Sequence, residues 1–314
     1  MLMYMKIAVI DLGTNTFNLL IVNVNADHSY STIFQTKISV KLAEGGINKG
    51  FIAPVPFQRG QDAFKTHFET TQQYKADKIF AFATSAIRGA SNGDEFVQKI
   101  KQDTGIDIQV ISGDREAELI YYGVRSAVKM TDEAALIIDI GGGSTEFIIA
   151  NKEQIFWKQS FLLGAARLLE LFPPSDPIID KEIAVFVDHL TKELQPLFDA
   201  VKKYPVKELL GSSGSFDSLA EMIVHRFYTP GVLANKTEFT FNLEECELIY
   251  NDILKSTNAQ RLQMKGLVAM RVDMIVVSSI IVNFVIRSFE IEKMRLSTYS
   301  LKEGVIHEVL NGKL

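Results

Sequence analysis

The chain has 314 residues, of which 47% are hydrophobic and 23% are charged, and its formal net charge is −5. This composition is typical of a soluble globular protein, and the length allows about two domains. The acidic balance without a Lys/Arg cluster argues against nucleic acid as a partner, and the single cysteine, Cys246, excludes an internal disulfide and a cysteine-based zinc site.

No segment has the pattern of an export signal or a membrane anchor. Residues 1–6 lack the charged start and the cleavage site of a signal peptide. The longest apolar stretch, residues 274–286, contains polar side chains and is too short to span a bilayer. We therefore expect a cytoplasmic protein with no membrane partner.

The predicted secondary structure alternates strands and helices and then starts again. Apolar runs and helical spacing predict strands at residues 6–10, 17–23, 29–37, 78–83 and 106–111 and helices at 59–74, 92–103 and 113–130. The second series has strands at 134–140, 145–150, 154–160, 207–210 and 294–298, helices at 165–172, 181–201, 243–256, 268–289 and 301–310, and a helix that ends at 227. This pattern predicts an α/β fold with two related domains, residues 1–130 and 131–314, flanking a ligand-binding cleft. The last helix, at about 301–314, is a candidate to pack back on the first domain.

Each half opens with the same motif: an apolar run, an aspartate, a glycine-centred turn with hydroxyl side chains, and a second apolar run. The motif covers residues 7–22, with Asp11, and residues 136–149, with Asp139. Each copy is predicted to be a β-hairpin whose glycines allow positive φ and close approach of a ligand. Successive N–H groups in such a turn bind anions, and the aspartate would hold a cation that bridges to phosphate. Two copies indicate two half-sites that close on one phosphorylated substrate.

Three further segments place polar residues at strand or helix ends. Arg88 follows the strand at 78–83, where a guanidinium can bind phosphate through two hydrogen bonds. Glu116 and Glu118 lie in the first turn of a helix, where acids also favour the helix dipole, and only one of them can face the cleft. The run at 211–215 is typical of an anion site or of an ordinary strand-to-helix turn, and it lacks a P-loop lysine. The histidines lie outside these motifs, which disfavours a covalent mechanism.

Together the motifs resemble the Ppx/GppA family of exopolyphosphatases and guanosine pentaphosphate phosphohydrolases, within the actin/hexokinase/sugar-kinase (ASKHA) superfamily. The matching stretches are residues 10–22, 83–92, 110–124, 136–149, 163–168, 210–220 and 297–305. The resemblance implies two actin-like, ribonuclease H-like domains beside the cleft and hydrolysis of terminal phosphoanhydrides with Mg²⁺. A monovalent cation such as K⁺ is a further candidate cofactor.

The family's site residues carry over position by position. Glu116, in the Ser-Gly-x-x-Glu-Ala motif, matches the catalytic glutamate. The phosphate-binding residues that the match implies are Gly13, Thr14, Asn15, Thr16, Arg88, Gly141, Gly142, Gly143, Ser144, Gly211, Ser213, Gly214 and Ser215, and the metal ligands are Asp139, Asp11 and Glu146. Two positions depart from the family pattern: Arg115 stands where a second acid is common, and Lys302 replaces the arginine of an Arg-Glu-Gly motif.

We therefore predict a phosphohydrolase that releases the terminal phosphate of inorganic polyphosphate or of pppGpp (guanosine pentaphosphate) by direct attack of water. Glu116 would activate the water, while hairpin N–H groups and Arg88 stabilise charge on the transferred phosphoryl group. The sequence does not rank the two substrates, and the oligomeric state stays open, with a homodimer as one candidate. Because the predicted elements end with the helix at 301–310 and the net charge is negative, we expect short polyphosphates and distributive cleavage.

Three alternatives remain. One is a kinase or ATPase of the same superfamily, since a fold does not determine the reaction. Another is a non-catalytic polyphosphate or (p)ppGpp binding protein, and the third is an actin-like structural protein. The lack of a separate adenosine-specific feature argues against the first, and the retention of every acid in the motifs argues against the second.

Overall fold

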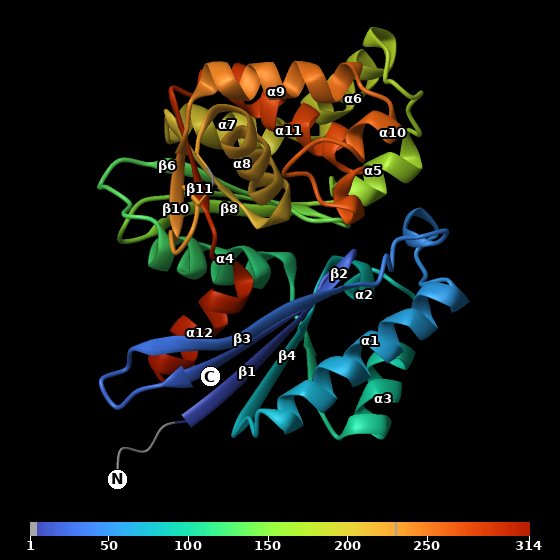
Figure 1. Ribbon diagram of the computed structural model, residues 1–314, viewed down its shortest axis with the longest axis vertical. Coiled ribbons are helices and arrows are strands. Elements are labelled where there is room, and N and C mark those ends of the chain that lie inside the picture. The colour runs from blue at the N-terminus through green and yellow to red at the C-terminus, as the bar shows by residue number, and fades with distance from the viewer. Residues whose placement is uncertain (1–4, 230) are drawn as a thin grey trace.

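The computed structural model of the protein describes residues 5–229 and 231–314. Its strands form two sheets, one in each half of the molecule (Figure 1). Both sheets begin with three antiparallel strands and continue with two parallel ones, and the second sheet ends with one more antiparallel strand at its edge. This arrangement confirms the predicted α/β class with two related halves.

The first sheet has the strand order β3-β2-β1-β4-β5. Its strands are β1 (Met5–Leu12), β2 (Thr16–Val24), β3 (Tyr30–Ser39), β4 (Lys78–Ala83) and β5 (Ile108–Val110). The helices of this half are η1 (Ile47–Lys49), α1 (Pro54–Gln73), α2 (Ser85–Arg88) and α3 (Gly93–Thr104). One face of the sheet packs with α1 and α3 around Phe17, Phe64 and Phe96, which are fully buried. The continuous apolar runs of β1 and β2 are buried because both faces of the sheet are covered.

The second sheet has the order β10-β11-β9-β6-β7-β8, so β8-β7-β6-β9-β11 repeats the order of the first sheet. Its strands are β6 (Ala135–Ile140), β7 (Thr145–Ala150), β8 (Ile155–Phe161), β9 (Glu208–Ser212), β10 (Glu238–Phe241) and β11 (Lys293–Ser297). The helices here are α5 (Ala165–Leu171), α6 (Asp180–Glu193), α7 (Gln195–Lys203), α8 (Ser213–Phe227), α9 (Leu243–Lys255), α10 (Asn258–Arg261), η2 (Ala269–Arg271) and α11 (Ile275–Ser288). They form the largest apolar core with the outer face of this sheet.

Two helices join the halves. α4 (Gly113–Ala127) contacts β7 and β8 of the second sheet, α12 (Leu301–Leu310) contacts β1 of the first, and the two helices pack on each other (Figure 1). One apolar core therefore includes side chains of both sheets and both helices. The predicted boundary at 130/131 falls between the last strand of one sheet and the first strand of the other, while α4 and α12 each cover the sheet of the opposite half.

The α4–α12 crossing depends on two glycines. A Cβ atom on Gly304 would lie 1.8 Å from the carbonyl oxygen of Leu119, and one on Gly123 would lie 1.9 Å from that of Ser300. Both positions are helical, so glycine is present for close backbone approach.

Two predicted helices differ from the structure. The helix at 181–201 is divided into α6 and α7, because Pro196 in the first turn of α7 has no N–H to continue the preceding helix. The helix at 268–289 begins only at Ile275, after the short turn η2. The short elements α2, α10 and β10 were not predicted, since four residues give too little periodicity.

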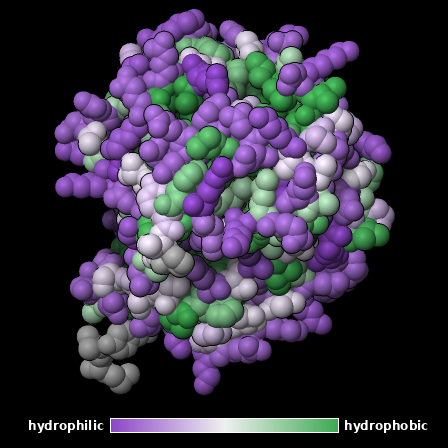
Figure 2. Space-filling model, turned by 45° about the horizontal axis from the view of Figure 1, so that its top comes forward, coloured by the Kyte–Doolittle hydropathy of each residue, from purple (hydrophilic) through white to green (hydrophobic). Residues whose placement is uncertain are grey.

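Apolar side chains on the face shown in Figure 2 occur in small groups separated by hydrophilic ones. Among the helices that the structure describes, none is long and apolar enough to cross a membrane.

We predict that Gly304→Ala destabilises the protein by roughly 1–3 kcal/mol, because the new methyl group forces α12 away from α4. Thermal and urea unfolding measure the change. Ser126→Ala, at an exposed position on α4, is the control and should change stability by less than about 0.5 kcal/mol. Equal stability of the two variants would contradict this account of the crossing.

Candidate active site

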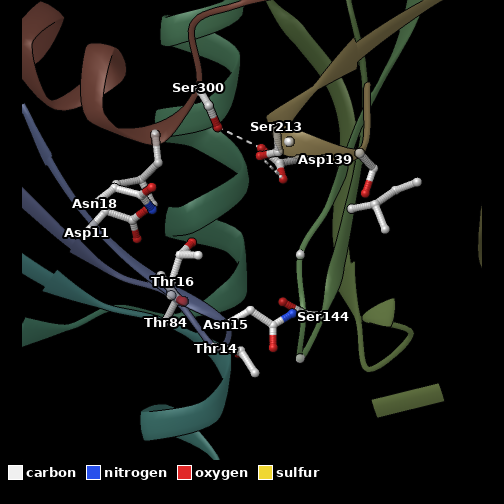
Figure 3. A pocket seen from close by; sticks show the side chains of 18 of the residues that line it. Asp11, Thr14, Asn15, Thr16, Asn18, Thr84, Asp139, Ser144, Ser213 and Ser300 are labelled. Atoms are coloured by element: carbon white, nitrogen blue, oxygen red, sulfur yellow. Dashed lines mark hydrogen bonds between the residues drawn. The ribbon is translucent and has the colours of Figure 1, made fainter. Parts of the chain in front are cut away.

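A polar cavity of about 170 Å³ lies where the turns of the two sheets meet. Figure 3 shows Thr14 and Asn15 of the first β-hairpin opposite Ser144 of the second, with Asp11 and Asp139 on either side. The lining includes Asp11, Gly13, Thr14, Asn15, Thr16, Glu116, Asp139, Gly141, Gly142, Gly143, Ser144, Glu146, Ser213, Gly214 and Ser215. The fold thus brings almost all the predicted site residues into one space.

The two hairpin turns are nearly in contact. A Cβ atom on Gly142 would lie 2.3 Å from Nδ2 of Asn15, and one on Gly143 would lie 2.6 Å from Oγ1 of Thr14. The expectation of positive φ is wrong, since the glycines of both turns have negative φ. A side chain is excluded at Gly142 and Gly143 because side chains of the first half (Asn15, Thr14 and Ser85), rather than a strained dihedral, occupy the space.

The carbonyl groups of the second turn point away from the cavity. The first N–H groups of α5 bind them: Ala165 N donates to the Gly141 oxygen (2.9 Å) and Ala166 N to the Gly142 oxygen (3.0 Å). The side chain of Arg167 donates through Nε to the Gly143 oxygen (2.9 Å). These bonds satisfy N–H groups that a helix N-terminus leaves free and fix the orientation of the turn.

The first turn is held in the same way by the segment after β3. Leu42 N donates to the Thr14 oxygen (2.7 Å) and Val40 N donates to the Asn15 oxygen (2.8 Å). Gly141 N donates to the Ser144 oxygen (3.0 Å) within the second turn, while the N–H groups of Asn15, Gly142 and Gly143 make no hydrogen bond among the described residues and are left for a ligand in the cavity. Such successive N–H groups form a concave site for an anion.

Asp139 is held by three hydroxyl groups. Its carboxylate accepts hydrogen bonds from Ser213 (2.6 Å), Ser300 (2.7 Å) and Ser212 (3.2 Å), two of which are drawn in Figure 3. Ser213 has a φ of 71°, which is unusual for a residue with a side chain. This conformation places its hydroxyl on Asp139 at the start of α8.

Two further acids have raised pKa values. Burial raises the pKa of Glu146 to about 7, and repulsion from Asp139 adds to the shift, although Ser144 and Ser160 donate to the same carboxylate (both 2.7 Å). Burial also raises the pKa of Asp11 to about 6, against the opposing effect of Lys302.

Glu116 lies in the first turn of α4, the helix whose N-cap residue is Ser112, and is 7% exposed. Burial raises its pKa well above the ordinary value, and the charge of Glu146 adds to this effect. Nη1 of Arg88 donates to its carboxylate (2.9 Å) and to the carbonyl oxygen of Ile111 (2.9 Å). Glu118 instead binds Arg115 on the side toward α12, so only Glu116 faces the cavity.

Two predicted phosphate-binding residues do not line the cavity. The guanidinium of Arg88 is bound to Glu116, so in this structure it contacts the acid and not the open space. Gly211 lies within β9, where a Cβ atom would be 2.0 Å from the ring of Phe216, so the glycine makes room for core packing.

Several lining residues were not predicted. Lys37, Arg271 and Lys302 contribute cationic groups, and Asp217 contributes a carboxylate whose pKa burial raises to about 6. Lys37 comes from a strand with no recognisable motif, Asp217 lies in the matched stretch 210–220 without having been singled out, and Arg271 lies in a segment predicted as a plain helix. Ser85 is 3% exposed and lines the cavity, and its hydroxyl has no hydrogen-bond partner in the part of the chain that the structure describes.

The donor set suits a hard divalent cation. Five carboxylates line the cavity against three cationic side chains, an excess of two negative charges. The raised pKa values of Asp11, Glu116, Glu146 and Asp217 show that burial leaves these four acids short of counter-charge. Within residues 5–229 and 231–314, no three acid, histidine or cysteine side chains form a ready-made metal cage. Mg²⁺ usually takes one or two carboxylates and completes its shell with water and substrate oxygens, so this arrangement fits it.

Comparison with known proteins adds an independent observation. The family model of the Ppx/GppA phosphatase family matches residues 20–312. Exopolyphosphatase 1 of Mycobacterium tuberculosis is 26% identical, over 98% of this chain and 89% of its own. A guanosine-5'-triphosphate,3'-diphosphate pyrophosphatase of Photobacterium profundum is 27% identical over 97% of this chain, which spans 59% of that longer protein.

Solved structures share the fold over the full length. An exopolyphosphatase from Cytophaga hutchinsonii has a TM-score of 0.95 and 38% identity, with 98% of each chain covered. A Ppx/GppA family member from Aquifex aeolicus has a TM-score of 0.81 and 24% identity, with 99% of this chain and 100% of that chain covered.

We predict that Mg²⁺ stabilises the protein far more at about pH 8 than at about pH 5. The folded-state pKa values of Asp11 and Glu146 exceed their unfolded values, so the folded protein binds more protons. Without metal, stability therefore falls as pH rises from about 4 through about 7, and levels off above that range. A bound divalent cation stabilises the ionised acids and so removes this loss of folding stability at high pH. Melting temperatures with Mg²⁺ or EDTA at both pH values measure it, and an equal effect of Mg²⁺ at the two pH values would contradict the cation site.

We predict that Gly142→Val removes protection of the protein by inorganic phosphate against thermal unfolding, because the new side chain collides with Asn15 and displaces the turn. The control is Gly105→Asn, at an exposed left-handed position after α3, which should keep the protection. If phosphate still raised the melting temperature of Gly142→Val at wild-type concentrations, the turn would not be the anion site.

Proposed function

The chain belongs to the Ppx/GppA phosphatase family, and we propose that this phosphohydrolase removes the terminal phosphate of inorganic polyphosphate. The observation that supports the proposal is the pair of facing turns, whose carbonyls are bound from behind and whose N–H groups are directed to one cavity beside Glu116. A terminal phosphoryl group presents non-bridging oxygens that such N–H groups can bind.

The second candidate substrate is pppGpp, because a relative named for the pentaphosphate matches 97% of the chain. Both substrates end in a phosphoanhydride. None of the residues that line the cavity is aromatic, so the cavity has no ring on which a guanine could stack. This composition favours inorganic polyphosphate.

In the proposed mechanism Glu116 orients and deprotonates the attacking water. Burial and the neighbouring Glu146 raise its pKa, which makes the carboxylate a stronger base. Arg88 holds the carboxylate in place through the 2.9 Å bond, and it can bind a substrate oxygen when the site fills. No side chain forms a covalent intermediate in this proposal, since direct attack of water needs only a base and an in-line phosphoryl group.

The two turns stabilise the charge that spreads over the transferred phosphoryl group. Their N–H groups are preorganised, because α5 and the segment at 40–42 fix the carbonyls of the same peptides. The hydroxyl of Ser85, unpaired among the described residues, lies beside Gly143 and can donate to the same group. Lys37, Arg271 and Lys302 can bind the next phosphates of the chain.

Asp139, Asp11 and Glu146 would hold a magnesium ion, which supplies positive charge to the non-bridging oxygens. A polyanion entering an acid-rich cavity needs such a counter-charge, and a monovalent cation such as K⁺ is the second cation to test. A cytoplasmic location and a homodimer stay predictions of the sequence, as does the absence of nucleic-acid and membrane partners.

Phosphate release tests the proposal, with short and long polyphosphate, pppGpp and ATP as substrates, each with and without Mg²⁺ and K⁺. We expect Mg²⁺-dependent release, fastest from polyphosphate. Release mainly from ATP would make the protein an ATPase, and release from none of the substrates would make it a binding protein. Gel analysis of partly digested long polyphosphate separates distributive cleavage, which gives a ladder of intermediates, from processive cleavage.

We predict that Glu116→Gln lowers kcat roughly 10²–10⁴-fold with little change in substrate affinity, because the amide keeps the shape of the side chain and cannot take a proton. Glu118→Gln, two residues along the same helix and bound to Arg115, is the matched control. The control should retain kcat within a few-fold. A Glu116→Gln protein with near wild-type kcat would exclude this residue as the base.

A further inference from the structure

A second cavity lies in the upper half of the molecule, between α8, α9 and α11 (Figure 1). Its volume is about 210 Å³, and no residue that lines it also lines the active-site cavity. For scale, an engineered apolar cavity of about 150 Å³ in another protein holds benzene. The walls are Leu219 of α8, Leu243, Cys246, Glu247 and Tyr250 of α9, and Ser279, Val282, Asn283, Ile286 and Arg287 of α11.

The interior of this cavity is apolar except for one hydroxyl and one thiol. Ser279 is 4% exposed, and its Oγ has no hydrogen-bond partner among the residues that the structure describes. The neighbouring Ser278, in contrast, is paired with Ser215 (3.0 Å). An unpaired buried hydroxyl is unfavourable, so a ligand group that pairs with it gains affinity. Burial raises the pKa of the Cys246 thiol to about 12, so this wall carries no charge.

The opening of the cavity is lined by polar side chains that are hydrogen-bonded to one another. Glu247 accepts hydrogen bonds from Arg287 (3.0 Å) and from Asn283 (3.1 Å). These two charged side chains are 42% and 66% exposed, which places them at the solvent side, above the buried Ser279 and Val282. Because Glu247 and Arg287 form an ion pair, the opening offers no unpaired cation that would bind an anion.

We propose that this cavity is a binding site for a small neutral molecule with an apolar body of one or two rings and a single hydrogen-bonding group. The rings fill the space between Leu219, Val282 and Ile286, and the polar group pairs with the hydroxyl of Ser279. Tyr250 supplies an aromatic wall for the ring. A phosphorylated compound does not fit, because nothing in the interior compensates its charge.

Phenol and toluene are the probes, since they differ by one hydroxyl group. NMR titration of the methyl-labelled protein should show both probes shifting the methyl signals of Leu219, Val282 and Ile286. Ser279→Ala should weaken phenol binding roughly 3- to 10-fold and leave toluene binding unchanged. Ser288→Ala, at an exposed position on the same helix, is the matched control and should affect neither probe.

A second variant tests the location without removing the hydroxyl. Val282→Phe fills the cavity and should abolish binding of both probes, and its melting temperature shows whether it is folded. If it does not fold, the methyl shifts of the wild-type protein decide the question. Saturating phosphate should leave the affinities unchanged. The proposal is overturned if the probes shift no methyl signal of this cavity, if folded Val282→Phe still binds them, or if phosphate competes with them.

Discussion

The structure depends on one contact, in which Gly142 and Gly143 of the second turn pack directly against the side chains of Asn15 and Thr14 of the first. Gly142 and Gly143 make this possible because any Cβ atom would collide with Asn15 or Thr14. The contact joins the two sheets through the turn of the first β-hairpin in each. It also gives two sets of N–H groups one common space. A larger residue would separate the turns and leave two half-sites that each bind an anion weakly.

Gathering these acids in one cavity costs electrostatic free energy. Five acids line a buried cavity with three cationic partners, and burial raises the pKa values of Asp11, Glu146 and Asp217 in consequence. A fold selected only for stability would not keep such acids together. The arrangement becomes favourable when a cation and a polyanion enter together, since each needs the other in this cavity.

The sequence was sufficient to predict the two related halves of the fold and most residues of the site. Both hairpins are recognisable in the sequence by an aspartate and a glycine-containing turn after an apolar run. The structure places these turns face to face. Arg271 and Lys37 could not be found this way, because they reach the cavity from elements without a motif. The reason for Gly142 and Gly143 was also misjudged: side chains of the first half, distant in sequence, require these glycines, and local dihedrals do not. Likewise, the pairing of Arg88 with Glu116 depends on how α2 meets α4, which no local pattern encodes.

The most direct test is a crystal structure of the Glu116→Gln protein with a short polyphosphate and Mg²⁺. The terminal phosphoryl group should lie between the two turns, within hydrogen-bond distance of N–H groups from both. The amide at position 116 should face the oxygen of a water in line with the scissile bond. A terminal phosphate bound to one turn alone, or outside the cavity, would contradict the claim that the facing turns form a single phosphoryl site.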